Sequence, residues 1–262
     1  MASSAEPPSA SPRSDLGGKP HAGAWVVLPT YNEAENLAGI SAAILEALPG
    51  CTLLVVDDAS PDGTGSLADE LASTEPRIRV RHRAAKQGLG RAYIDGFAVA
   101  LDGGAERIVQ MDADWSHEPC YLPAMLAALD DGADLVIGSR YVPGGGVRDW
   151  GLVRRIVSRG GSVFARAVLG LSPHDLTGGL KAWRRAALEA IDWQLLHSGG
   201  SVFQIEATYL ASRAGCRVDE VPIIFSDRRV GESKMSRRII AEALVVVLRL
   251  RWDELRGRGP RR

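Results

Sequence analysis

Residues 109–119 read VQMDADWSHEP, an apolar run that ends in two carboxylates separated by one residue. The run predicts a buried strand, and a strand that stops at Asp112-Ala113-Asp114 carries both carboxylates out of its C-terminal end. Ligand crevices of α/β proteins form at that edge of the sheet. Two hard anionic oxygen donors beside an open crevice suit Mg²⁺ or Mn²⁺ that already carries substrate phosphates. The stretch therefore predicts a metal site at Asp112 and Asp114, and a merely solvated acidic pair is the alternative.

Strands alternate with helices over the first half of the chain. Short apolar runs predict strands at residues 24–28, 52–56, 78–81, 107–111 and 134–138, and helical apolar spacing predicts helices at 33–48, 64–73, 90–101 and 121–129. This alternation implies right-handed crossovers and a mostly parallel central sheet flanked by helices. The predicted fold class is therefore α/β. We expect the polar residues that follow the strands to converge at one edge of this sheet.

The pattern changes after Arg140. A Gly-rich loop at 143–146 precedes a helix at 152–169, and shorter edge or antiparallel strands are expected within 175–183 and 218–225. The chain is expected to divide into a disordered leader at 1–23, one domain at 24–235, an amphipathic helix at 236–250 and a basic tail at 251–262. The leader is rich in Ser, Ala, Pro and Gly and lacks an apolar core of signal-peptide length.

Bulk composition narrows the functional classes. Of the 262 residues, 45% are hydrophobic and 24% are charged, as in ordinary soluble domains. The formal net charge of −1 argues against nucleic-acid binding, which requires a basic surface. The three cysteines are scattered without metal-ligand spacing, which is typical of a reducing compartment. No apolar run reaches the ~20 residues that span a bilayer, and the nearest, Ile239–Leu250, is interrupted by Glu242 and Arg249.

Two segments that follow the first two strands combine turn residues with carboxylates. The segment PTYNE (29–33) suits a helix start with an acidic first turn, while Tyr31 and Glu33 suit the lining of a nucleotide-base pocket, and both interpretations stay open. In DDASPDGT (57–64), turn chemistry explains Pro-Asp-Gly but not an acid doublet at the end of a buried strand. We expect Asp58 to accept hydrogen bonds from a base or a ribose.

Other polar and aromatic residues have plainer interpretations. Gly88-Leu89-Gly90 lacks the spacing of the known phosphate-binding loops, so we expect a helix start packed against the sheet, with Lys86 as a weak phosphate candidate. His117 is a lone histidine for which we expect a structural role, and Trp150 is expected to be a packing residue or a loop anchor.

The segment FSDRRVGESK (225–234) is a polar, Gly-containing loop between an apolar strand and the terminal helix. A solvated loop is one interpretation. The other is that Arg228 and Lys234 fold over bound phosphates and neutralise a leaving diphosphate.

Taken together, these segments resemble the dolichyl- or polyprenyl-phosphate mannose synthases, inverting glycosyltransferases of the A-type fold. The resemblance covers nearly the whole chain from Trp25 to Leu250. It rests on PTYNEAENL (29–37), VVDDASPDGT (55–64), QGLGRA (87–92), DADWSHEP (112–119), GSRY (138–141), VSRG (157–160), DLTGG (175–179) and FSDRRVGESKMS (225–236). Several of these segments are common to many glycosyltransferases, whereas the whole set in this order is specific.

The resemblance implies a role for each matched residue. The guanosine part of GDP-mannose would be held by Pro29, Tyr31, Glu33, Val56 and Asp58. The diphosphate and a Mg²⁺ or Mn²⁺ cofactor would be bound by Asp112, Ala113 and Asp114. The donor or the reacting phosphates would also be contacted by Arg140, Arg228 and Lys234. The phosphate of the lipid acceptor would be held by Arg140, Arg154 and Ser158, and the catalytic residues would be Asp112, Asp114 and Arg140.

Two positions depart from the family pattern. Relatives often have glycine where this chain has Ala59, and some have Leu-Gln or Leu-Ser where it has Trp115-Ser116. The second departure leaves the role of the Trp115 side chain open.

The implied reaction transfers mannose from GDP-mannose to a polyprenyl phosphate, with inversion and with GDP as the second product, so residues 24–235 would form a catalytic domain. The attacking phosphate oxygen is already anionic near neutral pH, so no strong general base is required. A metal with Arg and Lys can stabilise the leaving group electrostatically. The same chemistry with UDP-glucose and a non-catalytic binding subunit are the two alternatives.

A lipid acceptor requires a membrane. We expect peripheral association with the cytoplasmic face, either directly or through a separate integral membrane protein. The terminal helix carries an apolar stripe followed by arginines, which suits an interfacial helix or a helix packed on its own domain.

Overall fold

The computed structural model describes residues 21–148, 150–196, 198, 200, 202–226 and 237–257. The strands are β1 (Ala24–Thr30), β2 (Thr52–Asp57), β3 (Ile78–His82), β4 (Arg107–Gln110), β5 (Leu135–Ser139), β6 (Gly146–Val147), β7 (Lys181–Arg184), β8 (Val218–Pro222) and β9 (Ile224–Phe225). The helices are α1 (Ala34–Ala47), α2 (Thr64–Thr74), α3 (Leu89–Asp102), α4 (Leu122–Asp130), α5 (Leu152–Leu169), α6 (Arg185–Ala190), α7 (Phe203–Arg213) and α8 (Arg237–Leu255). This order confirms the predicted alternation of strands and helices.

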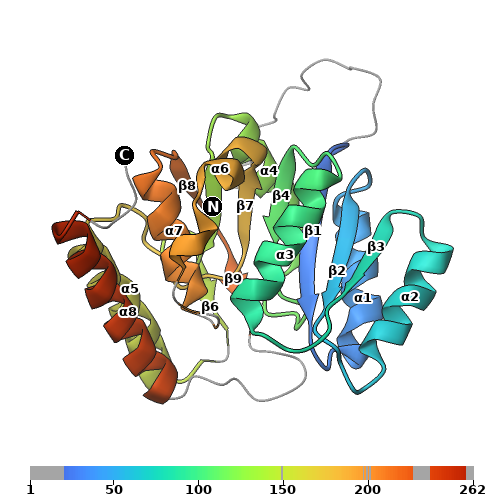
Figure 1. Ribbon diagram of the computed structural model, residues 1–262, viewed down its shortest axis with the longest axis horizontal. Coiled ribbons are helices and arrows are strands. Elements are labelled where there is room, and N and C mark those ends of the chain that lie inside the picture. The colour runs from blue at the N-terminus through green and yellow to red at the C-terminus, as the bar shows by residue number, and fades with distance from the viewer. Residues whose placement is uncertain are drawn as a thin grey trace, which may run out of the picture.

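A seven-stranded sheet in the order β3-β2-β1-β4-β7-β5-β8 forms the centre of the molecule (Figure 1). All neighbouring strands are parallel except β7, which is antiparallel to both β4 and β5. The sheet is therefore mostly parallel, as expected. Strand β7 is antiparallel as one prediction allowed, but it lies inside the sheet rather than at its edge. Strands β6 and β9 form a separate two-stranded parallel ladder.

Helices cover both faces of the sheet because successive side chains of a buried strand point to opposite faces. On β1, Trp25 and Val27 join one apolar core with residues of α3, α6 and α7, while Val26 and Leu28 join a second core with residues of α1 and α4. All four side chains are buried. The strands thus read as continuous apolar runs, which is why the sequence predicts them well.

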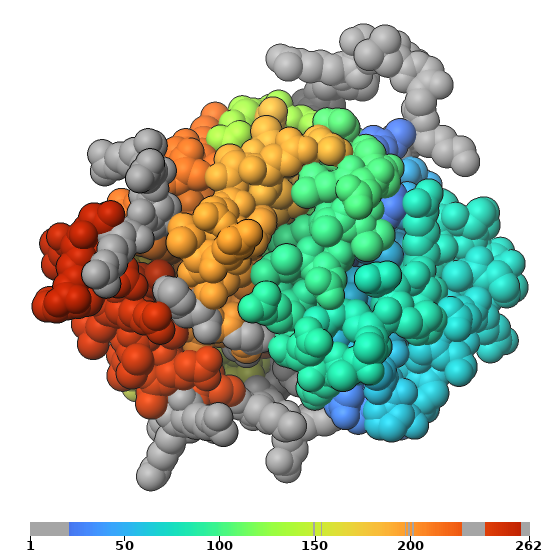
Figure 2. All heavy atoms as spheres, in the orientation of Figure 1, coloured from blue at the N-terminus to red at the C-terminus, as the bar shows by residue number. Residues whose placement is uncertain are grey.

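Helices α5 and α8 pack against each other at one end of the molecule, beyond α7 and β8 (Figure 1). The space-filling view shows α8 forming that end (Figure 2). Helix α5 has the predicted bounds, and Gly170 ends it in the left-handed conformation that favours glycine. Helix α8 runs to Leu255, five residues beyond the predicted end at Leu250, so the start of the expected basic tail is helical. No helix within the described ranges is long and apolar enough to cross a membrane.

Candidate active site

An open pocket lies at the carboxyl ends of β1, β2 and β4, where the sequence predicts the ligand crevice. It encloses about 560 Å³ of space, including its open mouth. Its lining residues are Pro29, Thr30, Tyr31, Glu33, Asp58, Leu89, Ala92, Asp112, Ala113 and Asp114. Seven of these were named from the sequence as donor-binding residues. Segments distant in the sequence meet here because parallel strands place their ends at one edge.

Each of the three strands is followed by a residue in the left-handed backbone region. These are Asn32 after β1, Ala59 after β2 and Trp115 after β4, with φ angles of 59°, 56° and 63°. This conformation costs a non-glycine residue ~1–2 kcal/mol, so the surrounding structure must hold each loop in place. Glycine adopts this conformation without that cost, so the glycine of the family pattern would fit the position of Ala59. Trp115 packs with the apolar core that contains α1 and α4, which gives its side chain a structural role.

The carboxylates of Asp112 and Asp114 suit a divalent cation whose other ligands would come from a diphosphate and water. Asp114 is 4% exposed and its Oδ1 accepts a hydrogen bond from the backbone N–H of Ser116 at 3.0 Å. A side chain at Gly179 would lie 2.9 Å from Asp112 Oδ2, so glycine keeps space beside that oxygen. Among the residues described, no three or more His, Cys, Asp or Glu side chains are grouped to enclose a metal. Mg²⁺ is usually bound by one or two carboxylates with phosphates and water completing its shell.

Tyr93 orients one of these carboxylates and was not identified from the sequence. Its fully buried hydroxyl, on α3, donates a hydrogen bond of 2.7 Å to Asp112 Oδ1. Burial raises the pKa of Tyr93 well above its usual value, with the negative charge of Asp112 adding to the shift, so the hydroxyl stays protonated and remains a donor. The one sequence signal for this role is the position of Tyr93, one turn into α3 and on the same buried face as Gly90 and Gly96.

Replacing Tyr93 with phenylalanine should weaken metal binding about tenfold without unfolding the protein, because residues that orient a ligand typically affect metal affinity to that extent. Mn²⁺ affinity, measured by electron paramagnetic resonance, and thermal stability test this expectation. Tyr209→Phe, on α7, is the matched control, because it removes another buried tyrosine hydroxyl that does not bond to Asp112 or Asp114. Equal Mn²⁺ affinity in Tyr93→Phe and wild type would contradict the orienting role.

Asp58 is held by an arginine that no sequence motif predicts. Arg83, directly after β3, forms a buried ion pair with Asp58. The same guanidinium group donates to Asp95 at 2.7 Å and to Gln87 at 3.1 Å. Asp58 is 5% exposed and still lines the pocket, so its carboxylate is fixed at the pocket wall.

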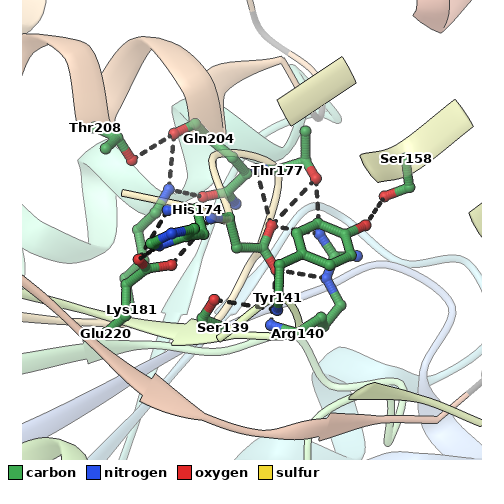
Figure 3. Close-up of polar contacts among 11 residues, drawn as sticks. Ser139, Arg140, Tyr141, Ser158, His174, Thr177, Lys181, Gln204, Thr208 and Glu220 are labelled. Atoms are coloured by element: carbon green, nitrogen blue, oxygen red, sulfur yellow. Dashed lines mark hydrogen bonds and ion pairs between the residues drawn. The ribbon is translucent and has the colours of Figure 1, made fainter. Parts of the chain in front are cut away.

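Arg140 lies outside the pocket lining, in a buried ion pair at the end of β5. Asp175 Oδ2 accepts from its Nε at 2.6 Å and from its backbone N–H at 3.0 Å, and Oδ1 accepts from Nη2 at 2.6 Å. Thr177 also accepts from Nη2, at 2.7 Å (Figure 3). Burial opposes ionisation of Asp175, but the Arg140 charge and these hydrogen bonds outweigh it and lower the pKa of Asp175. The segment DLTGG thus orients Arg140.

Two of the three predicted acceptor-phosphate residues, Arg154 and Ser158, lie on α5, and Ser158 contacts Tyr141, the residue that follows the third, Arg140. The Tyr141 hydroxyl donates to Ser158 Oγ at 2.7 Å (Figure 3). Arg154, in the first turn of α5, lies over the ring of Trp150. The structure therefore brings Arg140, Arg154 and Ser158 into one neighbourhood. Arg228 and Lys234 lie outside the described residues.

Three buried residues lie beneath the site: Val56 and His117, which were named from the sequence, and Lys181, which was not. Val56 is fully buried in an apolar core and does not line the pocket, so its side chain packs beneath the site. His117 is 1% exposed, and burial lowers its pKa to about 4, which keeps it neutral near pH 7. Lys181, on β7, donates to the backbone oxygen and to Oε1 of Gln204, each at 2.8 Å (Figure 3). Burial lowers the pKa of Lys181 to about 7, opposed by Asp175 and Asp112.

Most of the chain is similar to known glycosyltransferases. The model of glycosyl transferase family 2 matches residues 25–192. Polyprenol monophosphomannose synthase of Mycolicibacterium smegmatis is 49% identical over 237 residues, which cover 88% of this chain and 89% of that protein. Undecaprenyl-phosphate mannosyltransferase of Micrococcus luteus is 48% identical over 236 residues, which cover 88% of this chain and 97% of that protein.

Solved structures share the fold at lower identity. Glucosyl-3-phosphoglycerate synthase from Mycobacterium tuberculosis, in complex with Mn²⁺, UDP-glucose and phosphoglyceric acid, matches with a TM-score of 0.62 and 23% identity over 86% of this chain and 79% of that chain. A mannosyltransferase from Pyrobaculum calidifontis, in complex with GDP-Man and Mn²⁺, matches with a TM-score of 0.57 and 20% identity over 98% of this chain and 69% of that chain. At these identities the matches establish the fold alone.

Proposed function

The chain belongs to glycosyl transferase family 2, and we propose that it transfers mannose from GDP-mannose to a polyprenyl phosphate, with inversion and with a requirement for Mg²⁺ or Mn²⁺. The observation that carries the proposal is the convergence of Glu33, Asp58, Asp112 and Asp114 on one pocket. Two relatives that are nearly half identical over most of the chain, both named as enzymes that join mannose to a polyprenyl phosphate, support the choice of sugar and acceptor.

In the proposed reaction, an anionic oxygen of the polyprenyl phosphate attacks C1 of mannose from the face opposite the diphosphate. The bond between C1 and the diphosphate oxygen breaks, and its electron pair leaves with GDP. The acceptor oxygen carries no proton near neutral pH, so the protein needs no general base. Its task is to hold two anions together and to stabilise the charge of the departing diphosphate.

The residues of the site divide this task. Asp112, oriented by Tyr93, and Asp114 would hold the divalent cation, which when bound acts as a Lewis acid on the diphosphate. Asp58, fixed by Arg83, presents a carboxylate that can accept hydrogen bonds from a nucleobase. Arg140, oriented by Asp175, would place a guanidinium group near α5, the helix that carries the predicted acceptor-phosphate residues Arg154 and Ser158.

The test is transfer of labelled mannose from GDP-mannose to a short-chain polyprenyl phosphate by the purified protein with Mn²⁺ or Mg²⁺. We expect a mannolipid that does not form when EDTA is added. UDP-glucose runs in parallel, and transfer of glucose but not mannose would replace the donor while keeping the reaction class. Absence of transfer with either donor, together with tight GDP binding, would favour a binding subunit.

We further propose that α5 and α8 hold the protein on the cytoplasmic membrane face. The large hydrophobic side chains that are exposed in the described chain all belong to these two helices: Leu152, Ile156, Val163, Leu244, Val245, Leu248, Trp252 and Leu255. On each helix, the spacing of these residues places most of them along one stripe, away from the face that packs inward. Helix α5 adds four arginines and no acidic residue, which suits anionic lipids.

Introducing two glutamates, Leu248→Glu with Trp252→Glu, should reduce binding to vesicles of phosphatidylcholine and phosphatidylglycerol by about tenfold or more, because it places charge in the apolar stripe. Co-sedimentation measures the bound fraction. Arg81→Glu on β3 is the matched control, because it changes the net charge equally at the opposite end of the sheet. Equal loss in the control would attribute binding to net charge rather than to these helices.

A further inference from the structure

We propose that Trp150 is a positioning residue that holds Arg140 and Arg154 together to receive the acceptor phosphate. This inference rests on the proposed function, because it assigns the ligand of the two arginines. From the sequence, Trp150 is expected to be a packing residue or a loop anchor, and three features of its surroundings point to this more specific role.

First, the Trp150 ring contacts both arginines. The guanidinium carbon of Arg154 lies 4.1 Å from the ring centroid and that of Arg140 lies 5.4 Å from it. Arg140 follows β5 and Arg154 lies in the first turn of α5, so the ring joins two separate elements. Both distances are within the ~6 Å at which a cation is attracted to an aromatic face.

Second, an aromatic ring holds a cation without cancelling its charge. Two guanidinium groups that point into one site repel each other. A second carboxylate between them would remove that repulsion but would also repel the phosphate, and Asp175 already pairs with Arg140 on one side. The Trp150 ring attracts both cations through its quadrupole without placing a further negative charge beside the phosphate.

Third, the ring is fixed and carries a buried donor. Trp150 is 8% exposed, and Phe225 packs edge-on against it with 5.2 Å between centroids. Phe225 in turn contacts His117, 5.0 Å away, in the segment that follows Asp114. These rings connect the predicted metal site to α5. The Trp150 Nε1–H has no hydrogen-bond partner among the described residues, and an oxygen of the acceptor phosphate would supply one.

The experiment compares Trp150→Leu, Trp150→Phe and wild type in binding farnesyl phosphate by isothermal titration calorimetry. We expect Trp150→Leu to bind about tenfold more weakly, because it loses two cation–π contacts and a donor, and Trp150→Phe to fall between the two. GDP affinity should be unchanged in both variants. In steady-state transfer, KM for the acceptor should rise while KM for GDP-mannose stays constant.

Trp25→Leu is the matched control. Trp25 is 4% exposed and lies under the guanidinium group of Arg79, 4.8 Å from the ring centroid, but it stands at the opposite end of β1 from the pocket. Its replacement should lower thermal stability and leave farnesyl phosphate affinity unchanged, which separates a packing effect from a positioning effect.

Equal affinity of Trp150→Leu and wild type for farnesyl phosphate would overturn the inference and leave the proposed function intact. A parallel loss of GDP affinity would also overturn it, because the residue would then act on the whole site. Failure of the wild-type protein to bind farnesyl phosphate would overturn the proposed acceptor and, with it, this inference.

Discussion

Asp114→Asn is expected to keep the wild-type fold and to lose metal-dependent turnover by about 10²- to 10³-fold, the effect of removing one preorganised electrostatic group from a transition state. Asparagine has the same size, and its side-chain oxygen can still accept the hydrogen bond that Ser116 N–H donates to Asp114. The substitution therefore removes a negative charge from a side chain that is 4% exposed and changes little else. Initial rates over a range of Mn²⁺ concentrations measure the loss.

Asp57→Asn is the matched control for this prediction. Asp57 is also a buried carboxylate at the end of a strand, 3% exposed, but it accepts hydrogen bonds from Thr30 and Ser60 and does not line the pocket. Asp57→Asn should lower the melting temperature and leave the Mn²⁺ dependence of the rate unchanged. If Asp114→Asn retained wild-type rates at every Mn²⁺ concentration, the assignment of Asp114 as a metal ligand would be wrong.

The sheet and the pocket follow from sequence because both depend on local patterns. Apolar runs such as 52–56 are buried on both faces and end in turn residues, so their positions are readable without tertiary information. Parallel strands place their ends at one edge, which is why Glu33, Asp58 and Asp112 line one pocket as expected. The position of β7 between β4 and β5 could not be predicted from the sequence, because it depends on pairing with strands more than 40 residues away.

The residues that support the site were missed for a different reason. Tyr93 and Arg83 have no recognisable spacing relative to the carboxylates they contact, and only the packing of α3 and the end of β3 against neighbouring strands brings them there. The same limit applied to Val56, whose side chain belongs to the core rather than the pocket. Sequence patterns thus identified side chains that face the ligand and missed those that orient them.

Arg140→Gln should destabilise the protein by ~3–5 kcal/mol at neutral pH, because it leaves Asp175 as a buried carboxylate without its partner. Asp175 is 0% exposed, and Arg140 is the cation that lowers its pKa. The free energy of unfolding, measured by urea denaturation, gives the loss. Arg217→Gln is the control, because it breaks an ion pair with Asp219 that is exposed and worth little.

The pH dependence of stability should reverse in this variant. In the wild-type protein, the lowered pKa of Asp175 contributes stability that is present above its unfolded value of about 3.9 and is lost as the pH falls through the folded value. Without Arg140, burial raises the pKa of Asp175, so the folded state binds more protons than the unfolded state above that value. Arg140→Gln should therefore recover part of its stability between pH 7 and about pH 5, whereas a further loss on acidification would contradict the pairing.

The double variant Arg140→Gln with Asp175→Asn separates stability from activity. Two neutral amides leave no buried charge, so most of the stability lost in Arg140→Gln should return, as neutral replacements of buried ion pairs are often tolerated. The transfer rate should stay low, because the positive charge beside α5 is still missing. If the double variant regained both stability and activity, Arg140 would be a structural residue and the proposed contact with the reacting phosphates would be wrong. If stability returned without activity, the Arg140 guanidinium would be required for the reaction rather than for folding.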